Sequence, residues 1–149
     1  ARSGLGRSDG CHPQGPGGAV TAFVDTNVII RHLTSDPPAA GKRATHFLAT
    51  ADELLLADVI AAEIVFVLES YYRIPRAEVV RLLQSVIAFD AIRTIDSGVL
   101  LRALEVYEVD RLDFADAYLV ACAETAGVRT IASFDRAFDR VASIDRVAL

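Results

Sequence analysis

The organisation of this chain is set by the stretch AFVDTNVII, residues 22–30, in which a short apolar run meets an acid and a polar turn. The run over residues 22–24 predicts a buried strand that ends at Asp25, and the apolar residues after Asn27 predict the start of a helix. A strand followed at once by a helix is typical of α/β domains with a largely parallel sheet. Asp25 is then at the carboxyl end of its strand, where such folds form ligand sites.

The rest of the chain continues this alternation of apolar runs and helical patterns. Further strands are predicted over residues 54–56, 91–95, 128–132 and 142–144. Helices are predicted over about 36–50, 59–72, 75–89, 97–108 and 114–126, with a short one from about 135. Asp58, Asp113 and either Asp96 or Ser97 are placed to cap helices, and the helix over 59–72 is apolar on nearly every side, which predicts burial. We therefore expect an α/β fold with a mostly parallel sheet of four to five strands.

The composition fits one domain with a substantial core, because 52% of the 149 residues are hydrophobic. No apolar run approaches the roughly 20 residues of a membrane-spanning helix, so we expect a soluble protein. Cys11 and Cys122 form neither a disulfide framework nor a metal-binding spacing, which fits a reducing cytoplasm. The net charge of -5 argues against general attraction to nucleic acid, so any such contact must be local.

The first twenty residues, ARSGLGRSDGCHPQGPGGAV, differ from the rest of the chain. They are rich in Gly, Pro, Ser and Arg without apolar periodicity, which predicts a disordered leader. They also lack the apolar segment of a secretory signal. We expect a cloning remnant or a misplaced start codon, with the true start at Val20 and the folded domain over residues 21–149.

Four acids, Asp25, Glu63, Asp116 and Asp135, lie inside or at the end of strongly apolar stretches. An ionised carboxylate that is taken out of water loses several kcal/mol of solvation unless a partner compensates. The chain has a single lysine, Lys42, and its arginines fall mostly in polar turns and on exposed helix faces, so a divalent cation is the expected counter-ion. Four separate elements deliver these acids to one edge of the sheet, which predicts a metal site.

Each acid also has an ordinary structural interpretation. Asp25 can close a strand-to-helix turn, and Asp113 and Asp135 can cap helices. Glu63 is the hardest to explain in this way, because glutamate is rarely buried without a partner. Turn or cap roles are also open to the neighbouring polar residues, which are Thr26, Asn27 and Ser133.

Together, four segments resemble the motifs of PIN-domain nucleases of the VapC toxin type. They are FVDTNVII (23–30), AEI (62–64), DAYLVACA (116–123) and IASFDRAF (131–138). The resemblance covers almost everything from residue 20 onward, and it implies a PIN-like three-layer α/β/α sandwich. One departure is Ser133, which stands where the family frequently has threonine and which keeps the hydroxyl group.

The resemblance implies that Asp25, Glu63, Asp116 and Asp135 form an acidic quartet around Mg²⁺ or Mn²⁺. Thr26 and Asn27 match the polar residues that follow the first acid, whereas the role of Asp113, one turn before Asp116, stays open. The implied activity is endonucleolytic hydrolysis of RNA by a metal-bound water. Candidate phosphate-contacting residues on the rim are Arg31, Arg43, Arg73, Arg111 and Arg136.

The resemblance also implies two protein partners. One is a second copy of the chain in a homodimer, to which the apolar faces of the helices over residues 36–50 and 75–89 could contribute if they are not core. The other is a small antitoxin protein whose C-terminal segment occupies the acidic groove. An antitoxin arginine there would replace the charge of the metal.

Three other functions are weighed against the nuclease. A phosphoryl-accepting receiver domain needs a lysine near a late strand, where Lys42 does not lie. An aspartyl-phosphate phosphatase would carry a second acid at the position of Asn27. The third alternative is a catalytically silent PIN-like fold that serves as a dimeric interaction module or an RNA-binding module, and only an activity measurement separates it from the nuclease.

Overall fold

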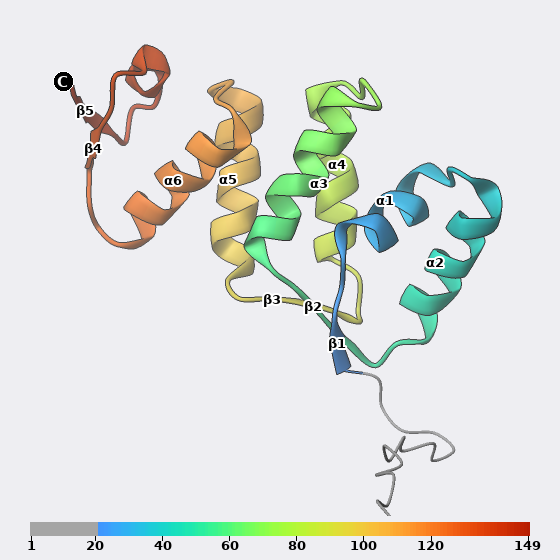
Figure 1. Ribbon diagram of the computed structural model, residues 1–149. Coiled ribbons are helices and arrows are strands. Elements are labelled where there is room, and N and C mark those ends of the chain that lie inside the picture. Colours follow the sequence, from blue (N-terminus) through green and yellow to red (C-terminus); the bar gives the residue numbers. More distant parts are fainter. Residues whose placement is uncertain (1–20) are drawn as a thin grey trace, which may run out of the picture.

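The computed structural model describes residues 21–149, which form six α-helices, one 3₁₀ helix and five short strands (Figure 1). The predicted leader, residues 1–20, lies outside the described residues. The elements follow in the order β1 (Thr21–Phe23), α1 (Thr26–Thr34), α2 (Pro38–Thr50), β2 (Glu53–Leu56), α3 (Asp58–Ser70), α4 (Arg76–Ile87), β3 (Ile92–Thr94), α5 (Ser97–Val109), α6 (Phe114–Thr125), β4 (Thr130–Ala132), η1 (Arg136–Arg140) and β5 (Asp145–Val147). The predicted alternation of strands and helices, and with it the α/β fold class, is confirmed.

The strands pair in parallel, but they form two sheets. The first has the order β1-β2-β3, with Ala22 opposite Leu54 and Leu54 opposite Ile92. The second contains β4 and β5, with Ile131 opposite Arg146. The expected parallel direction is confirmed, whereas the single sheet of four to five strands is corrected to one sheet of three strands and one of two.

The position of β4 accounts for this correction. Helices α5 and α6 pack closely against each other, and Figure 1 shows β4 and β5 on the far side of this pair from β1. The β4-β5 ladder continues on both sides of the strands, because the amide of Asp145 donates to the carbonyl of Arg129 and that of Ser133 to the carbonyl of Val147. An apolar run predicts a strand but does not specify its partner, which is fixed by packing between distant segments.

The core is one cluster that extends from the first sheet to the C-terminal elements. Helix α3 contributes Ile64 and Leu68, both fully buried, and α5 contributes Leu100 and Leu104. The expectation that α3 is buried on nearly every side is wrong. Its Val59 and Phe66 are 72% and 67% exposed, because only one face of the helix meets the sheet and the neighbouring helices.

Several local predictions need smaller corrections. The last strand begins at Asp145 instead of residue 142, because Val141 and Ile144 turn into the core before the strand starts. Asp58 is the first residue of α3 and does not cap it, since the N-cap position belongs to Ala57. Within residues 21–149, no helix combines the length and the apolar character that crossing a bilayer requires.

Candidate functional site

The first two acids of the predicted quartet meet at the end of β1. Asp25 follows the buried Val24 and caps α1 by accepting a hydrogen bond from the amide of Asn27 at 3.1 Å. The next residue, Thr26, is only 6% exposed, and its hydroxyl donates to Oε2 of Glu63 on α3 at 2.5 Å. The Thr26 hydroxyl therefore fixes one carboxylate oxygen of Glu63 beside the turn that carries Asp25.

Asp25 lies in the strand-to-helix turn as predicted, and the cap that it forms leaves room for a second role. A carboxylate has two oxygens with about four acceptor positions, and the amide of Asn27 occupies one of them. Asn27 itself is exposed and turns its backbone toward Asp25. The turn thus orients the carboxylate of Asp25 and leaves most of its hydrogen-bond acceptor positions open.

The last two acids of the quartet meet at the start of α6. Asp116 lies in the first turn of α6 and is half-buried. Burial, together with the negative charges of Asp135 and Asp113, raises the pKa of the Asp116 carboxyl. Three carboxylates therefore share a region of negative potential that favours either a proton or a cation at Asp116.

Asp135 and Asp113 differ in how their own backbones hold them. Asp135 caps η1 by accepting from the amide of Ala137 at 2.7 Å, and its own amide donates to Oγ of Ser133 at 3.0 Å. The predicted local role of Ser133 and the capping role of Asp135 are both confirmed. Asp113 occupies the N-cap position of α6, but its side chain makes no capping hydrogen bond.

The exposure of the acids differs from the expectation. Asp25, Glu63 and Asp135 are exposed and only Asp116 is half-buried. The apolar neighbours of Glu63 on α3 turn into the core, while the glutamate projects from the edge of that face. The need to compensate a buried charge, which led to the sequence prediction of a cation, therefore applies only to Asp116.

The chemistry of the four carboxylates fits a hard divalent cation, because Mg²⁺ and Mn²⁺ prefer oxygen ligands. In the described part of the chain, none of the four lies within ion-pair distance of an arginine, lysine or histidine. The spacing of these carboxylates fits a metal ion less well. Across residues 21–149, no three His, Cys, Asp or Glu side chains are spaced to hold one metal ion.

The contacts link the acids in two pairs, which we call the first acidic group, Asp25 and Glu63, and the second acidic group, Asp116 and Asp135. Asp25 follows β1 and Asp135 follows β4, and these strands belong to different sheets. Glu63 lies on α3 and Asp116 on α6, and these two helices contact each other.

Sequence reasoning missed Arg76, which holds the segment before α6. Its Nη1 donates to the carbonyl oxygens of Tyr107 at 2.7 Å and Leu112 at 2.6 Å, and its guanidinium lies 4.0 Å from the centre of the Tyr107 ring. Its Nη2 lies 3.3 Å from Glu69 and 4.0 Å from Asp113. Nothing in the sequence indicates these partners, because they lie more than thirty residues away except for Glu69.

A second missed contact joins α3 to α6. The hydroxyl of Tyr118 donates to Oδ2 of Asp58 at 2.5 Å, and this bond together with burial raises the pKa of Tyr118 above its ordinary value. The D-A-x-x-x-A spacing of the α6 motif contains Tyr118, but the sequence assigns it no role. The contact holds the helix of Asp116 against the helix of Glu63.

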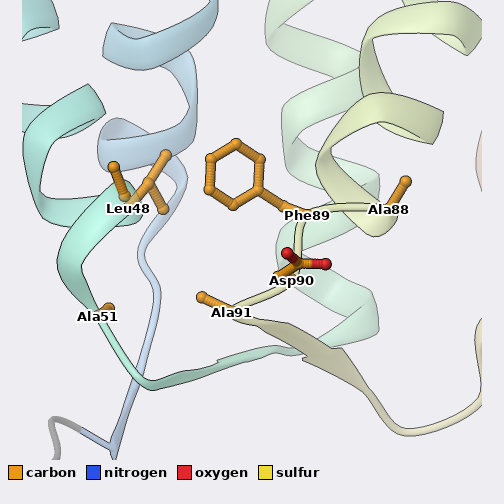
Figure 2. A pocket seen from close by; sticks show the side chains of 7 residues that line it. Leu48, Ala51, Ala88, Phe89, Asp90 and Ala91 are labelled. Atoms are coloured by element: carbon orange, nitrogen blue, oxygen red, sulfur yellow. The ribbon is translucent and has the colours of Figure 1, made fainter.

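The described surface has hollows that differ in their lining residues. One of about 200 Å³ opens beside Asn27 and also contains Arg31, Tyr71 and Tyr72. Another of about 310 Å³ lies between α3 and α6, with Phe66, Glu69 and Asp113 in its wall. A third of about 440 Å³ lies between the C-terminal ends of α2 and α4, where Phe89 faces Leu48 (Figure 2). None of the three hollows is lined by any of the four acids, but the first contains Asn27, which is bonded to Asp25, and the second contains Asp113. The third has no such link, so we do not assign it to the site.

Comparison with known proteins gives one match that covers most of the chain. The model of the PIN domain family matches residues 22–144. Among curated proteins, none matches this chain.

The solved structures to which this chain is similar include toxins and toxin–antitoxin complexes. Mycobacterium tuberculosis VapC20, described as a sarcin-ricin loop cleaving toxin, is 18% identical, with 79% of this chain and 92% of that chain covered and a TM-score of 0.40. Rickettsia felis VapBC2 bound to promoter DNA is 12% identical, with coverages of 87% and 99% and a TM-score of 0.35. A Klebsiella pneumoniae toxin–antitoxin complex is 18% identical, with coverages of 85% and 96% and a TM-score of 0.31.

Proposed function

This chain belongs to the PIN domain family, and on that premise we propose that it is a metal-dependent endoribonuclease and the toxin of a toxin–antitoxin pair. The catalytic residues of this proposal are Asp25, Glu63, Asp116 and Asp135, which also serve as ligands of Mg²⁺ or Mn²⁺. Thr26, Asn27 and Ser133 support them. Asp113 is an additional acid that either takes part in the site or only begins α6.

The observation that carries the proposal is the crowding of carboxylates at Asp116. This side chain is half-buried, and the charges of Asp135 and Asp113 add to burial in raising the pKa of its carboxyl. Carboxylates that come from different elements and lack a basic partner within ion-pair distance are typical of cation sites. Asp113 is the exception, since Arg76 approaches it to 4.0 Å.

The four acids differ in the chemistry available to them. A divalent ion held by the carboxylates would lower the pKa of a bound water and neutralise charge on the phosphate oxygens. Glu63 is oriented by Thr26, and Asp25 keeps free acceptor positions beside it. Asp135 is exposed, and in this proposal it positions the metal or the attacking water. No side-chain nucleophile is required.

The partners follow from the same proposal. The C-terminal segment of a small antitoxin would occupy the acidic site, where an arginine would meet carboxylates without a basic partner within ion-pair distance. The hollow between α3 and α6, with the exposed Phe66 in its wall, would take an apolar side chain of that segment, because its carboxylates, Glu69 and Asp113, already lie near Arg76. We also propose that the protein acts as a homodimer in the cytoplasm.

Cleavage of RNA tests the proposal directly. We expect the wild-type chain to cleave single-stranded RNA in Mg²⁺ or Mn²⁺ and to lose this activity in EDTA. Asp25→Asn and Asp116→Asn remove one acid from each group and should each lower the rate by at least about a hundredfold, because a ligand of the reacting centre is lost. Far-ultraviolet circular dichroism confirms that both variants are folded.

The same assay separates the nuclease from the alternative of a silent interaction or RNA-binding module. Equal activity in the wild type and both variants would show that a contaminant is responsible and would refute the catalytic assignment. Binding of RNA without cleavage in any metal would favour the silent module.

A further inference from the structure

The C-terminal end of α3 presents an aromatic side chain near the first acidic group. Tyr71 directly follows α3 and is 76% exposed. The ring of the next residue, Tyr72, packs against it edge to face, with 5.0 Å between the ring centres and 75° between the planes. Most of the Tyr71 side chain is nevertheless exposed to water, so part of its ring surface can contact a ligand.

Tyr71 forms one wall of the hollow of about 200 Å³ beside Asn27. The other polar walls are Arg31, Asp36 and Tyr72, with Ile30 and Val67 completing the lining. These walls are held in place by each other. The hydroxyl of Tyr72 donates to Oδ2 of Asp36 at 3.2 Å, and Nη1 of Arg31 donates to the carbonyl of Asp36.

The hollow is also connected to the candidate site through one of its lining residues. Asn27 lines it, and the amide of Asn27 donates to the carboxylate of Asp25 at 3.1 Å. Helix α3 carries Glu63 two turns before Tyr71, and α3 packs against α1. Neither Asp25 nor Glu63 lines the hollow, but a ligand there would contact Asn27, whose amide is bonded to Asp25.

The groups that line the hollow match the chemistry of a nucleobase. An aromatic ring and a planar guanidinium can stack on the faces of a base, and an amide and a carboxylate can pair with its edge. We propose that this hollow is a nucleotide subsite in which Tyr71 stacks on one base of single-stranded RNA next to the cleaved phosphate. This proposal rests on the proposed function and adds the residue that positions the substrate.

A neighbouring hollow extends the path of the strand. It has a volume of about 300 Å³, shares Asn27 and Arg31 with the first, and adds Arg43 and Phe47. In the described part of the chain, neither arginine lies within ion-pair distance of a carboxylate. A strand that leaves the base subsite across α1 would therefore bring its phosphates to two available guanidinium groups.

Binding of RNA in EDTA tests the subsite without requiring cleavage. A fluorescent single-stranded RNA of about ten nucleotides would be titrated with the full chain, with Tyr71→Ala and Tyr71→Phe. We expect Tyr71→Ala to weaken binding about tenfold, because base stacking is lost, and Tyr71→Phe to stay within about twofold of the wild type. Ile95→Ala is the matched control, since Ile95 is 86% exposed and lines neither hollow, and it should leave the affinity unchanged.

Three results would overturn the subsite. Unchanged affinity of Tyr71→Ala excludes stacking, and equal losses in Tyr71→Phe and Tyr71→Ala assign the effect to the hydroxyl. Unchanged RNA affinity of Tyr71→Ala with loss of binding to the cognate antitoxin would assign the hollow to a protein ligand. If RNA is cleaved in Mg²⁺ but Tyr71→Ala does not change RNA binding, only the proposed subsite is refuted. If RNA binding depends on Tyr71 but no RNA is cleaved, the proposed nuclease activity is refuted and the subsite is supported.

A second measurement covers the case in which Tyr71→Ala does not fold. The chain has four tyrosines and no tryptophan, so the ring resonances of Tyr71 can be assigned by comparison with Tyr71→Phe. We expect these resonances to shift when RNA is added to the wild-type chain. Unshifted Tyr71 resonances at saturating RNA would refute the proposal.

Discussion

At the scale of single residues, Thr26 is a buried residue that bonds one of the candidate catalytic carboxylates. Its hydroxyl is the donor that fixes Glu63, and its side chain is almost completely buried. Thr26→Val keeps the shape but removes the donor. We expect it to lower the free energy of unfolding by about 1–2 kcal/mol, because a hydrogen bond to a charged group is lost, and to slow RNA cleavage because Glu63 is no longer oriented.

Urea unfolding and single-turnover cleavage measure these two effects. Thr26→Ser is the matched control, since it retains the hydroxyl and should keep most of the activity. A Thr26→Val chain that cleaves RNA at the wild-type rate would show that the orientation of Glu63 does not matter for the reaction.

Local roles of residues near the candidate site could be predicted from sequence, but their burial could not. The motif at Asp25 predicts a strand followed by a turn into a helix, and in the structure Asp25 lies in that turn and caps α1. Glu63 was expected in the interior because its sequence neighbours are apolar, yet it is exposed. Burial depends on which face of α3 meets the sheet, and α3 is too uniformly apolar for its sequence to specify that face.

At the scale of elements, Glu124 joins α5, α6 and the segment before β5. It accepts two hydrogen bonds from Arg102 at 2.7 and 2.9 Å and a third from Ser143. The bond from Arg102 lowers the pKa of the Glu124 carboxyl, partly offset by burial, and the bond from Ser143 adds to the lowering. Because the pKa is lower in the folded than in the unfolded chain, ionised Glu124 stabilises the fold above the ordinary value of 4.5.

We therefore expect Glu124→Gln to lower the free energy of unfolding by about 1–2 kcal/mol at pH 7. The difference from the wild type should shrink as the pH falls through the lowered pKa, because Glu124 itself is then protonated. Urea unfolding at a series of pH values measures this. Glu105→Gln removes the other, more exposed carboxylate that pairs with Arg102 and should have little effect at any pH. A loss in Glu124→Gln that is independent of pH would contradict the ionic explanation.

The helices were the most predictable elements, because their start signals and apolar periodicity are local. The acid at position 96 caps α5 as expected, and α6 begins directly after Asp113. Strand pairing was less predictable. The run that forms β4 has the composition of a strand, but its only partner in the described chain is β5, which no local pattern indicates.

At the scale of the whole molecule, the proposed metal site spans two sheets. An ion that binds the acids in the folded chain and not in the unfolded chain stabilises the fold, so Mg²⁺ or Mn²⁺ should raise the melting temperature. We expect a rise of a few degrees at millimolar metal, which corresponds to roughly 1 kcal/mol. Differential scanning calorimetry provides the measurement.

The variants Asp25→Asn and Asp116→Asn serve as controls for the ion effect, because each removes one ligand from a different group. Both should respond less to the metal than the wild type does. If saturating metal leaves the melting temperature of the wild type untouched, the four acids do not share an ion in the folded chain.

Because the four acids come from separate elements, the affinity for an ion depends on how the two acidic groups lie relative to each other. If only a fraction of the molecules has the two acidic groups close together, the apparent dissociation constant exceeds the intrinsic one by the reciprocal of that fraction. A bound RNA or partner chain that joins the two sheets would enlarge this fraction and so increase the occupancy of the ion. By reciprocity, the ion would strengthen the binding of that partner by the same factor.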